Sequence, residues 1–454
     1  MNHATDNWTI TASIVYGEHD FENGWEWQEA EILRLVFRTS EGEVFQILLR
    51  AVVEEEDGGQ LRLRPNYDLY GRSKMRICGS VVPTSTRNGR CLEQIKEWMH
   101  TCFHTHKLCH RILEQGASRT MPSRLIYIGD DGPSRLICDS DDETGFAGIH
   151  YISLSHRWQL QVMPTLITSN LELCKERIDV TDFPPVFGDA VEISKWLGVK
   201  HIWIDALCII QDDKEDWRKE AAKMGRVYEN AICNLGGHAA ADQEGAGLCM
   251  DRDPRHVSLY PFVITRKDFE QYYYGYPMDI YSNDLHSSTL LHRGWVFQER
   301  LLSPRSVYFG RKLQWECCEL QACEVYPSGG PAEPLMAPWG TNGTPFRVAN
   351  MLSEEKRYQK ELGYWNQWRA KSIKDVELWE LHRKWLFIAE YFSRCQLTYE
   401  QDCFPALSGL ARYFQRILKD EYVAGIWRGN FISGLIWYHT PNQEGAHLRD
   451  YRGK

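Results

Sequence analysis

The fold is decided by residues 197–237, which read LGVKHIWIDALCIIQDDKEDWRKEAAKMGRVYENAICNLGG. Two short apolar runs, one near each end, enclose a charged segment in which apolar side chains recur at helical spacing. Acidic residues begin this segment, where the helix dipole favours them, and one of its faces carries Trp217, Ala221, Met224 and Tyr228. The pattern predicts a buried strand, an amphipathic helix and a second buried strand.

The residues before this stretch continue the same alternation. The segment IHYISLSHRW (149–158) is a short apolar run that ends in polar residues, as expected for a short buried strand. Next comes FPPVFGDAVEISKWLG (183–198), which has prolines at its start, helical apolar spacing and a terminal glycine. Strands that alternate with helices favour an α/β fold, in which a parallel sheet is flanked by helices.

Other segments differ from this alternation in composition. Two strands around a turn are expected in EILRLVFRTSEGEVFQILLRAVV (31–53), so the N-terminal unit is expected to be rich in β-structure. Gly and Pro are frequent after residue 324, whereas helical spacing dominates near the C-terminus. The expected units are 1–90 (β-rich), 91–147 (helical approach segment), 148–323 (α/β domain), 324–375 (long Gly/Pro-rich connection) and 376–454 (helical).

The composition disfavours polyanions and membranes as partners. The formal net charge of the 454 residues is −10, which argues against nucleic acid and anionic lipid. The late apolar stretch 422–438 is interrupted by Arg428 and Asn430, so it is not expected to span a membrane. The 14 cysteines follow no regular framework and no signal peptide is visible, which predicts reduced thiols and a cytoplasmic location.

Polar residues follow the three expected strands of the parallel sheet. In such sheets ligands bind beyond the carboxyl ends of the strands. Those ends hold Ser155, His156 and Arg157, then Asp205, then Gly236, Gly237 and His238. The two glycines would let the backbone approach a phosphate. A buried Asp205 needs a partner, so it either caps the next turn or pairs with Arg157 or a ligand.

A second candidate site lies in HRGWVFQERLL (292–302). If this stretch is helical, Trp295 and Glu299 lie one above the other on one face. Three arginines are close in sequence, at positions 293, 300 and 305, so a structural ion pair would explain Glu299. The alternative is a carboxylate held for chemistry, and the residue types alone leave both readings open.

Cysteine and histidine concentrate in HTCFHTHKLCH (100–110). Zinc sites usually show two tight ligand pairs separated by a loop, and Cys102, His106 and Cys109 supply at most one such group. The only other concentration of cysteines is 317–323, without a CxxC pair. We therefore expect buried thiols and surface histidines on an amphipathic helix, and no metal. Cys208 lies in an apolar run and is expected to be an inert core thiol.

The chain resembles the fungal heterokaryon-incompatibility (HET) domain. The resemblance is carried by YISLSHRW, the 197–231 block, LHRGWVFQERLLSPRSVYF and LQWEC, in this order. Flanking motifs, from WMHTCFHTHKLC to YVAGIWRGNFISGLIWY, extend it over roughly residues 90–440. The chain departs from the family at Gln159, where a glycine usually follows the tryptophan of the first motif. The family implies non-self recognition between fungal strains that ends in growth arrest or cell death.

HET domains are distantly similar to Toll/interleukin-receptor (TIR) domains, which implies a flavodoxin-like sheet. Several TIR domains cleave NAD with a glutamate four residues after a tryptophan, and Trp295 and Glu299 match that spacing. The resemblance implies that Asp205 matches the acidic end of the second strand. In such a reaction an arginine such as Arg157 can hold the diphosphate and Trp158 or Trp295 can stack on a ring, and Arg293 is a further candidate for substrate binding. NAD would then be a substrate, and no cofactor is expected.

Three functions follow from these features. The first is a HET-family effector of incompatibility or cell death, with NAD glycohydrolase activity through Glu299. The second is a stand-alone enzyme of fungal secondary metabolism that acts on a small molecule. The third is a non-catalytic signalling module that works by self-association, as many TIR domains do, and self-association is expected in any case.

Overall fold

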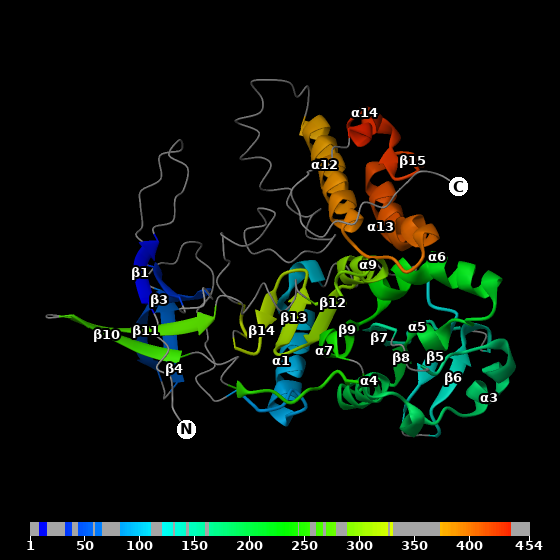
Figure 1. The fold of residues 1–454 in the computed structure, drawn as a ribbon. Coiled ribbons are helices and arrows are strands. Elements are labelled where there is room, and N and C mark those ends of the chain that lie inside the picture. The colour runs from blue at the N-terminus through cyan, green and yellow to red at the C-terminus, as the bar shows by residue number, and fades with distance from the viewer. Residues whose placement is uncertain are drawn as a thin grey trace.

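The structure is a computed structural model in which the parallel sheet is the central feature (Figure 1). It describes residues 9–15, 32–38, 44–57, 60–65, 82–109, 120–129, 132–141, 145–158, 163–243, 245–254, 260–266, 269–277, 288–325, 327–329 and 373–436.

Four neighbouring strands form the parallel part of an 8-stranded sheet. In spatial order they are β8 (His201–Trp203), β7 (Ile152–Ser155), β9 (Cys233–Gly237) and β12 (Arg305–Phe309). Numbered along the chain, this order is 2-1-3-4, the order with which flavodoxin-like sheets begin. The α/β prediction with a mostly parallel sheet is confirmed.

Antiparallel strands extend the sheet at both edges. Beyond β12 lie β13 (Leu313–Cys317) and β14 (Gln321–Cys323). Beyond β8 lie β5 (Arg124–Tyr127) and β6 (Arg135–Cys138). The segment expected to be a helical approach begins with α1 (Gly89–Thr105) and is helical again at residues 107–109. Its second half supplies two strands of the sheet.

Helices cover both faces of the sheet, with α4 (Pro185–Trp196) and α6 (Lys214–Asn230) on opposite sides (Figure 1). Asp213 caps α6 by accepting hydrogen bonds from the backbone of Glu215 and Asp216. The apolar run HIWIDALCII (201–210) was expected to form one buried strand, and only its beginning does so. Its strand β8 ends at Trp203, and the chain turns at once into α5 (Asp205–Cys208). Cys208 is fully buried, which agrees with a core thiol, and burial raises its pKa to about 12.

A second, 6-stranded sheet is antiparallel. The predicted hairpin is confirmed as β2 (Ile32–Arg38) paired with β3 (Val44–Asp57). Two strands from the middle of the chain complete this sheet. One of them, β11 (Phe269–Pro277), pairs with β3, which no local pattern indicated. The remaining strands are β1 (Thr9–Val15), β4 (Gln60–Pro65) and β10 (Tyr260–Arg266).

The C-terminal helices pack on the helix that carries Glu299. This helix, α9 (Gly294–Leu302), and the long helices α12 (Ile373–Ser393) and α13 (Cys403–Leu418) enclose a second apolar core. Trp385 lies at its centre, with its ring edge-on to Phe414 and Trp427. The unit ends in a short hairpin and a final helix, namely β15 (Tyr422–Val423), β16 (Ile426–Trp427) and α14 (Phe431–Leu435).

Two glycines let α6 and α13 cross in direct backbone contact. A Cβ atom built on Gly225 would lie 2.7 Å from the Cα of Gly409. We expect Gly225→Ala to destabilise the fold by about 1–3 kcal/mol, because neither backbone can yield. The matched control is Gly188→Ala in α4, where nothing lies within 4 Å of the added Cβ. That change should stabilise the fold by roughly 0.5–1 kcal/mol through helix propensity. Denaturant unfolding measures both, and equal effects would contradict the close crossing.

Candidate functional site

Glu299 is buried inside the domain, with 4% of its surface exposed. It lies on α9, which begins directly after Arg293, and it faces the carboxyl end of β7. The hydroxyl of Ser155, the last residue of β7, donates a hydrogen bond to a carboxylate oxygen of Glu299. The Tyr228 hydroxyl from α6 donates to the backbone carbonyl of Leu154 at 3.2 Å and lies close enough to the same carboxyl to lower its pKa. Three separate elements therefore converge on one carboxylate.

Burial raises the pKa of Glu299 from 4.5 to about 7. The negative charge of Asp205 raises it further, whereas the hydroxyls of Ser155 and Tyr228 and the charge of Arg293 partly offset the shift. A carboxyl that titrates near neutral pH can be either protonated or ionised in the cell. Such perturbed groups concentrate at functional sites, although structural networks also produce them.

The three arginines near Glu299 in sequence all bind elsewhere. Arg293 donates to the backbone carbonyl of His156 at 2.8 Å. Arg300 forms a buried two-bond ion pair with Glu316, at 3.1 and 2.9 Å. Arg305 donates to the Cys102 sulfur and to a backbone carbonyl. Within the described part of the chain no ion pair joins Glu299 to a cation, so the structural ion-pair hypothesis is wrong there.

A polar network that we did not predict orients Ser155. The parallel pairing of β7 with β9 sets Ser153 opposite Asn234. The Asn234 amide nitrogen donates to the Ser155 oxygen at 2.9 Å, and Ser153 donates to the Asn234 carbonyl oxygen at 3.1 Å. Ser155 thus accepts from the Asn234 amide nitrogen, and its own proton has two acceptors within reach, Glu299 and the Asn234 carbonyl oxygen at 3.2 Å. The sequence signal was a lone asparagine inside the apolar run AICNLGG, since a buried amide must find partners.

Asp205 forms the outer part of the site. It accepts a hydrogen bond from the indole of Trp158 at 2.9 Å and lies 3.6 Å from Nδ1 of His156. It also accepts from the next backbone amide at 2.7 Å, as the turn-cap reading expected. Pairing with Arg157 is not seen, because that guanidinium donates to the carbonyl of Ala241 at 3.2 Å.

The His156 ring is buried, with 4% of the residue exposed. Burial lowers its pKa, as does the charge of Arg293, while Asp205 acts in the opposite direction. Its ring packs edge-on against Phe187 with 5.0 Å between centroids. Trp158 remains 37% exposed, so the rim above the buried Glu299 reaches solvent.

Three predicted site residues have their main contacts outside this network. Trp295 donates from its indole to Asp402 at 3.1 Å and meets the ring of Trp217, so it does not share the contacts of Glu299. His238 packs on Tyr308 with 4.8 Å between centroids, and burial together with Arg300 lowers its pKa to about 3. Gly237 is buried at the start of α7 (His238–Asp242). Gln159 lies outside the described residues.

The cysteine and histidine cluster has a member that the sequence pattern did not indicate. Besides Cys102, His106 and Cys109, the structure brings Cys317 from the end of β13 into the same group. The ligand atoms of all four lie within 4.8 Å of one another. His106 is half-buried and its Nδ1 faces sulfur, so the expectation of a surface histidine was wrong for this residue.

The hydrogen bond from Ser155 makes a testable contribution to the titration of Glu299. We expect Ser155→Ala to raise the pKa of Glu299 by about 1–2 units, since a hydrogen bond to a charged group is worth roughly 1.5–3 kcal/mol. Ser153→Ala is the control, because its hydroxyl reaches Asn234 and not the carboxylate. Carbon NMR of labelled glutamate follows the titration, and an unchanged midpoint in Ser155→Ala would contradict the assignment.

Comparison with known proteins identifies the domain that holds this network. Residues 151–299 match the family model described as heterokaryon incompatibility protein (HET). The match runs from the start of β7 to Glu299 and includes Ser155, Asp205 and Asn234. No curated protein and no solved structure matches the chain. Among the described residues, no helix is long and apolar enough to cross a membrane.

Proposed function

Because residues 151–299 form a HET domain, we propose that the chain is an effector of fungal non-self recognition whose output is cell death. The family description supports the role in heterokaryon incompatibility. We propose further that the effector chemistry is hydrolysis of NAD at the nicotinamide–ribose bond, with Glu299 as the catalytic carboxylate. The similarity to TIR domains motivates the choice of substrate.

The observation that carries the catalytic proposal is the state of Glu299. It is buried without a cationic partner in the described structure, and the hydroxyl group at the end of β7 holds it in place. It lies where β7 and β9 end, which is the point at which the strand order reverses direction. Open α/β sheets bind ligands at this point. A fold gains nothing from an unpaired buried carboxylate, so a functional reason is favoured.

The proposed reaction needs a carboxylate more than an acid. The bond between the ribose C1′ and the nicotinamide nitrogen breaks, and its electron pair leaves with neutral nicotinamide. The ribose becomes oxocarbenium-like, and an ionised Glu299 stabilises that positive charge, as in glycoside hydrolysis. Water then adds to C1′ and releases one proton. Since the pKa of Glu299 is about 7, the active ionised form grows as the pH rises through neutrality.

The rim residues fit binding roles around this carboxylate. Trp158 is exposed and held by Asp205, so it can stack on an aromatic ring, whereas Trp295 is occupied by Asp402. Arg157 is exposed close to it and can meet a diphosphate oxygen. Asp205 lies at the edge of the buried group, where a carboxylate can accept from ribose hydroxyls.

Nicotinamide release from NAD by the purified chain tests the proposal. The protein is assayed at high concentration, which also permits self-association. Turnover that disappears in a folded Glu299→Gln variant supports the glycohydrolase. Killing of fungal cells by an inactive Glu299→Gln variant would instead show a non-catalytic signalling module. Absence of turnover together with saturable binding of a small aromatic metabolite would favour a biosynthetic enzyme.

A further inference from the structure

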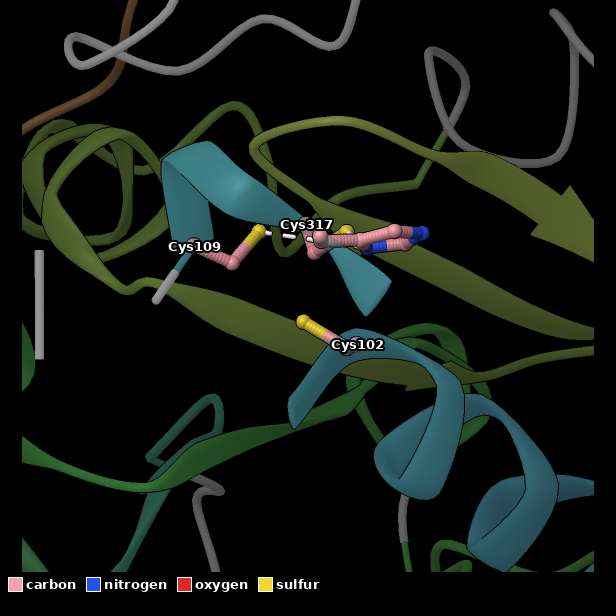
Figure 2. Close-up of side chains that lie close together, drawn as sticks. Cys102, Cys109 and Cys317 are labelled. Carbon is pink, nitrogen blue, oxygen red and sulfur yellow. Dashed lines mark hydrogen bonds between the residues drawn. The ribbon is translucent and has the colours of Figure 1, made fainter. Parts of the chain in front are cut away.

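Four potential metal ligands from distant parts of the chain meet at one point. They are Cys102 near the end of α1, His106 at its C-cap, Cys109 just after it and Cys317 at the end of β13. Figure 2 shows the three cysteine side chains directed toward a common space. We propose that these four residues form a structural zinc site.

The spacing of the ligand atoms fits tetrahedral zinc. Nδ1 of His106 lies 3.3 Å from the sulfur of Cys317 and 4.0 Å from that of Cys109. All four ligand atoms lie within 4.8 Å of one another. A tetrahedral ion with bonds of about 2.3 Å to sulfur and about 2.0 Å to nitrogen separates its ligand atoms by roughly 3.5–3.8 Å. Small side-chain shifts therefore suffice to close the shell.

The burial of the sulfurs favours a metal over solvated thiols. Cys102, Cys109 and Cys317 are each 0% exposed, and all three are free rather than disulfide-bonded. Three sulfurs around one imidazole nitrogen form a Cys₃His set, which is a known ligand set of structural zinc. Because the protein fills all four positions, no place remains for a reacting water.

The buried charge of Arg305 is an independent indication of a metal centre at this point. This arginine is 0% exposed, its Nε donates to the Cys102 sulfur at 3.1 Å, and its guanidinium lies 4.1 Å from the ring centre of Phe103. Another of its nitrogens donates to the carbonyl of Ile232 at 3.2 Å, and the remaining nitrogen has no hydrogen-bond partner among the described residues. A buried cation needs an opposite charge. Zinc with three thiolates and a neutral imidazole carries one net negative charge, which Arg305 would balance.

The site would join segments on either side of the HET domain. His106 and Cys317 are 211 positions apart, and none of the four ligands lies within residues 151–299. The rings of Trp98 on α1 and Trp315 on β13 stack nearby, with 6.0 Å between centroids. Zinc would therefore fasten α1 to the antiparallel edge of the sheet, and its binding energy would contribute to folding.

Metal analysis of the full chain, purified under reducing conditions with zinc in the culture, tests the site. We expect one zinc ion per chain that survives dialysis. Cobalt introduced in its place should give the intense visible bands of tetrahedral thiolate coordination. His106→Cys should retain the metal, because a fourth thiolate replaces the imidazole.

Cys317→Ser should lose the zinc, and Cys395→Ser is the matched control, since Cys395 is also a buried free cysteine but lies in the C-terminal core. If Cys317→Ser does not fold, the zinc content and cobalt spectrum of the unaltered chain decide. A folded wild-type chain that binds neither metal after anaerobic reconstitution overturns the proposal. Zinc retained in folded Cys317→Ser would overturn the ligand set.

Discussion

Glu299→Gln should lower the rate of nicotinamide release from NAD by about 100- to 10,000-fold, the range seen when a single catalytic group is removed. Glutamine has nearly the same shape and can still accept the hydrogen bond from Ser155, so the fold should persist. It cannot stabilise a developing positive charge. The assay is nicotinamide release at saturating NAD, with circular dichroism to confirm folding. Equal rates in both proteins would remove Glu299 from the reaction.

The pH profile gives the same prediction a second readout. In the wild-type chain the rate should rise with pH through about 7, because the ionised form of Glu299 is the active one. The charge of Asp205 raises the pKa of Glu299, so Asp205→Asn should move the midpoint to lower pH. A midpoint that moved upward would contradict this electrostatic coupling.

Glu299→Gln should also stabilise the fold at pH 8, by up to about 3 kcal/mol. The pKa of Glu299 is 4.5 in its reference state and about 7 in the folded protein. Because the folded value is the higher one, the stabilisation from the protonated group is fully present below pH 4.5 and is lost as the pH rises through 7. Between pH 5 and pH 8 the loss is about 2.5 kcal/mol.

Comparison with Glu299→Gln isolates this group, because other titrations, such as that of His156, occur in both proteins. The free energy of unfolding is measured by urea at pH 5 and pH 8. The variant should gain relative stability at the higher pH. A difference that does not change with pH would contradict the raised pKa.

Glu316→Gln is the matched control, and we expect it to lower the free energy of unfolding, whereas Glu299→Gln should raise it. Glu316 is also buried, but it forms two hydrogen bonds with Arg300 and accepts a third from Tyr308. Its loss leaves a buried guanidinium without its carboxylate, which typically costs about 3–5 kcal/mol. Two buried glutamates, 17 positions apart, should therefore respond to the same substitution in opposite directions.

Much of the parallel sheet follows from local patterns. The helix with Trp217 and Tyr228 on one face and the strands that end at Ser155 and Gly237 were predictable, because apolar periodicity reports burial directly. The meeting of polar residues at the carboxyl ends follows from the geometry of parallel strands. Local patterns also predicted the hairpin of β2 and β3.

Contacts between distant segments were not predictable in this way. The strands β5 and β6 are short and lie in a region that begins with a clear helix, so nothing local indicated that they extend the sheet. Similarly, β8 stops after three residues although its apolar run continues, because Asp205 turns the chain into α5. The pairing of β11 with β3 depends on register across more than two hundred residues.

The candidate site was likewise predictable only in part. Residue types placed Ser155, Asp205 and Glu299 among the candidates, but they could not decide between an ion pair and an unpaired carboxylate. That choice depended on where three arginines point, and each of them binds elsewhere. Tyr228 was read as part of an apolar face, although its hydroxyl reaches Glu299. The fourth cysteine of the cluster was beyond any local spacing rule.

The titration of Glu299 itself is the most direct test that this carboxylate is held without a compensating cation. The infrared difference between the wild-type chain and Glu299→Gln isolates the carbonyl band of the protonated carboxyl, which can be followed as the pH is raised. A midpoint near 7 is the expected result, because burial outweighs the effect of the Ser155 and Tyr228 hydroxyls. A midpoint at or below the ordinary value of 4.5 would show that a cation compensates Glu299 and would return it to a structural role.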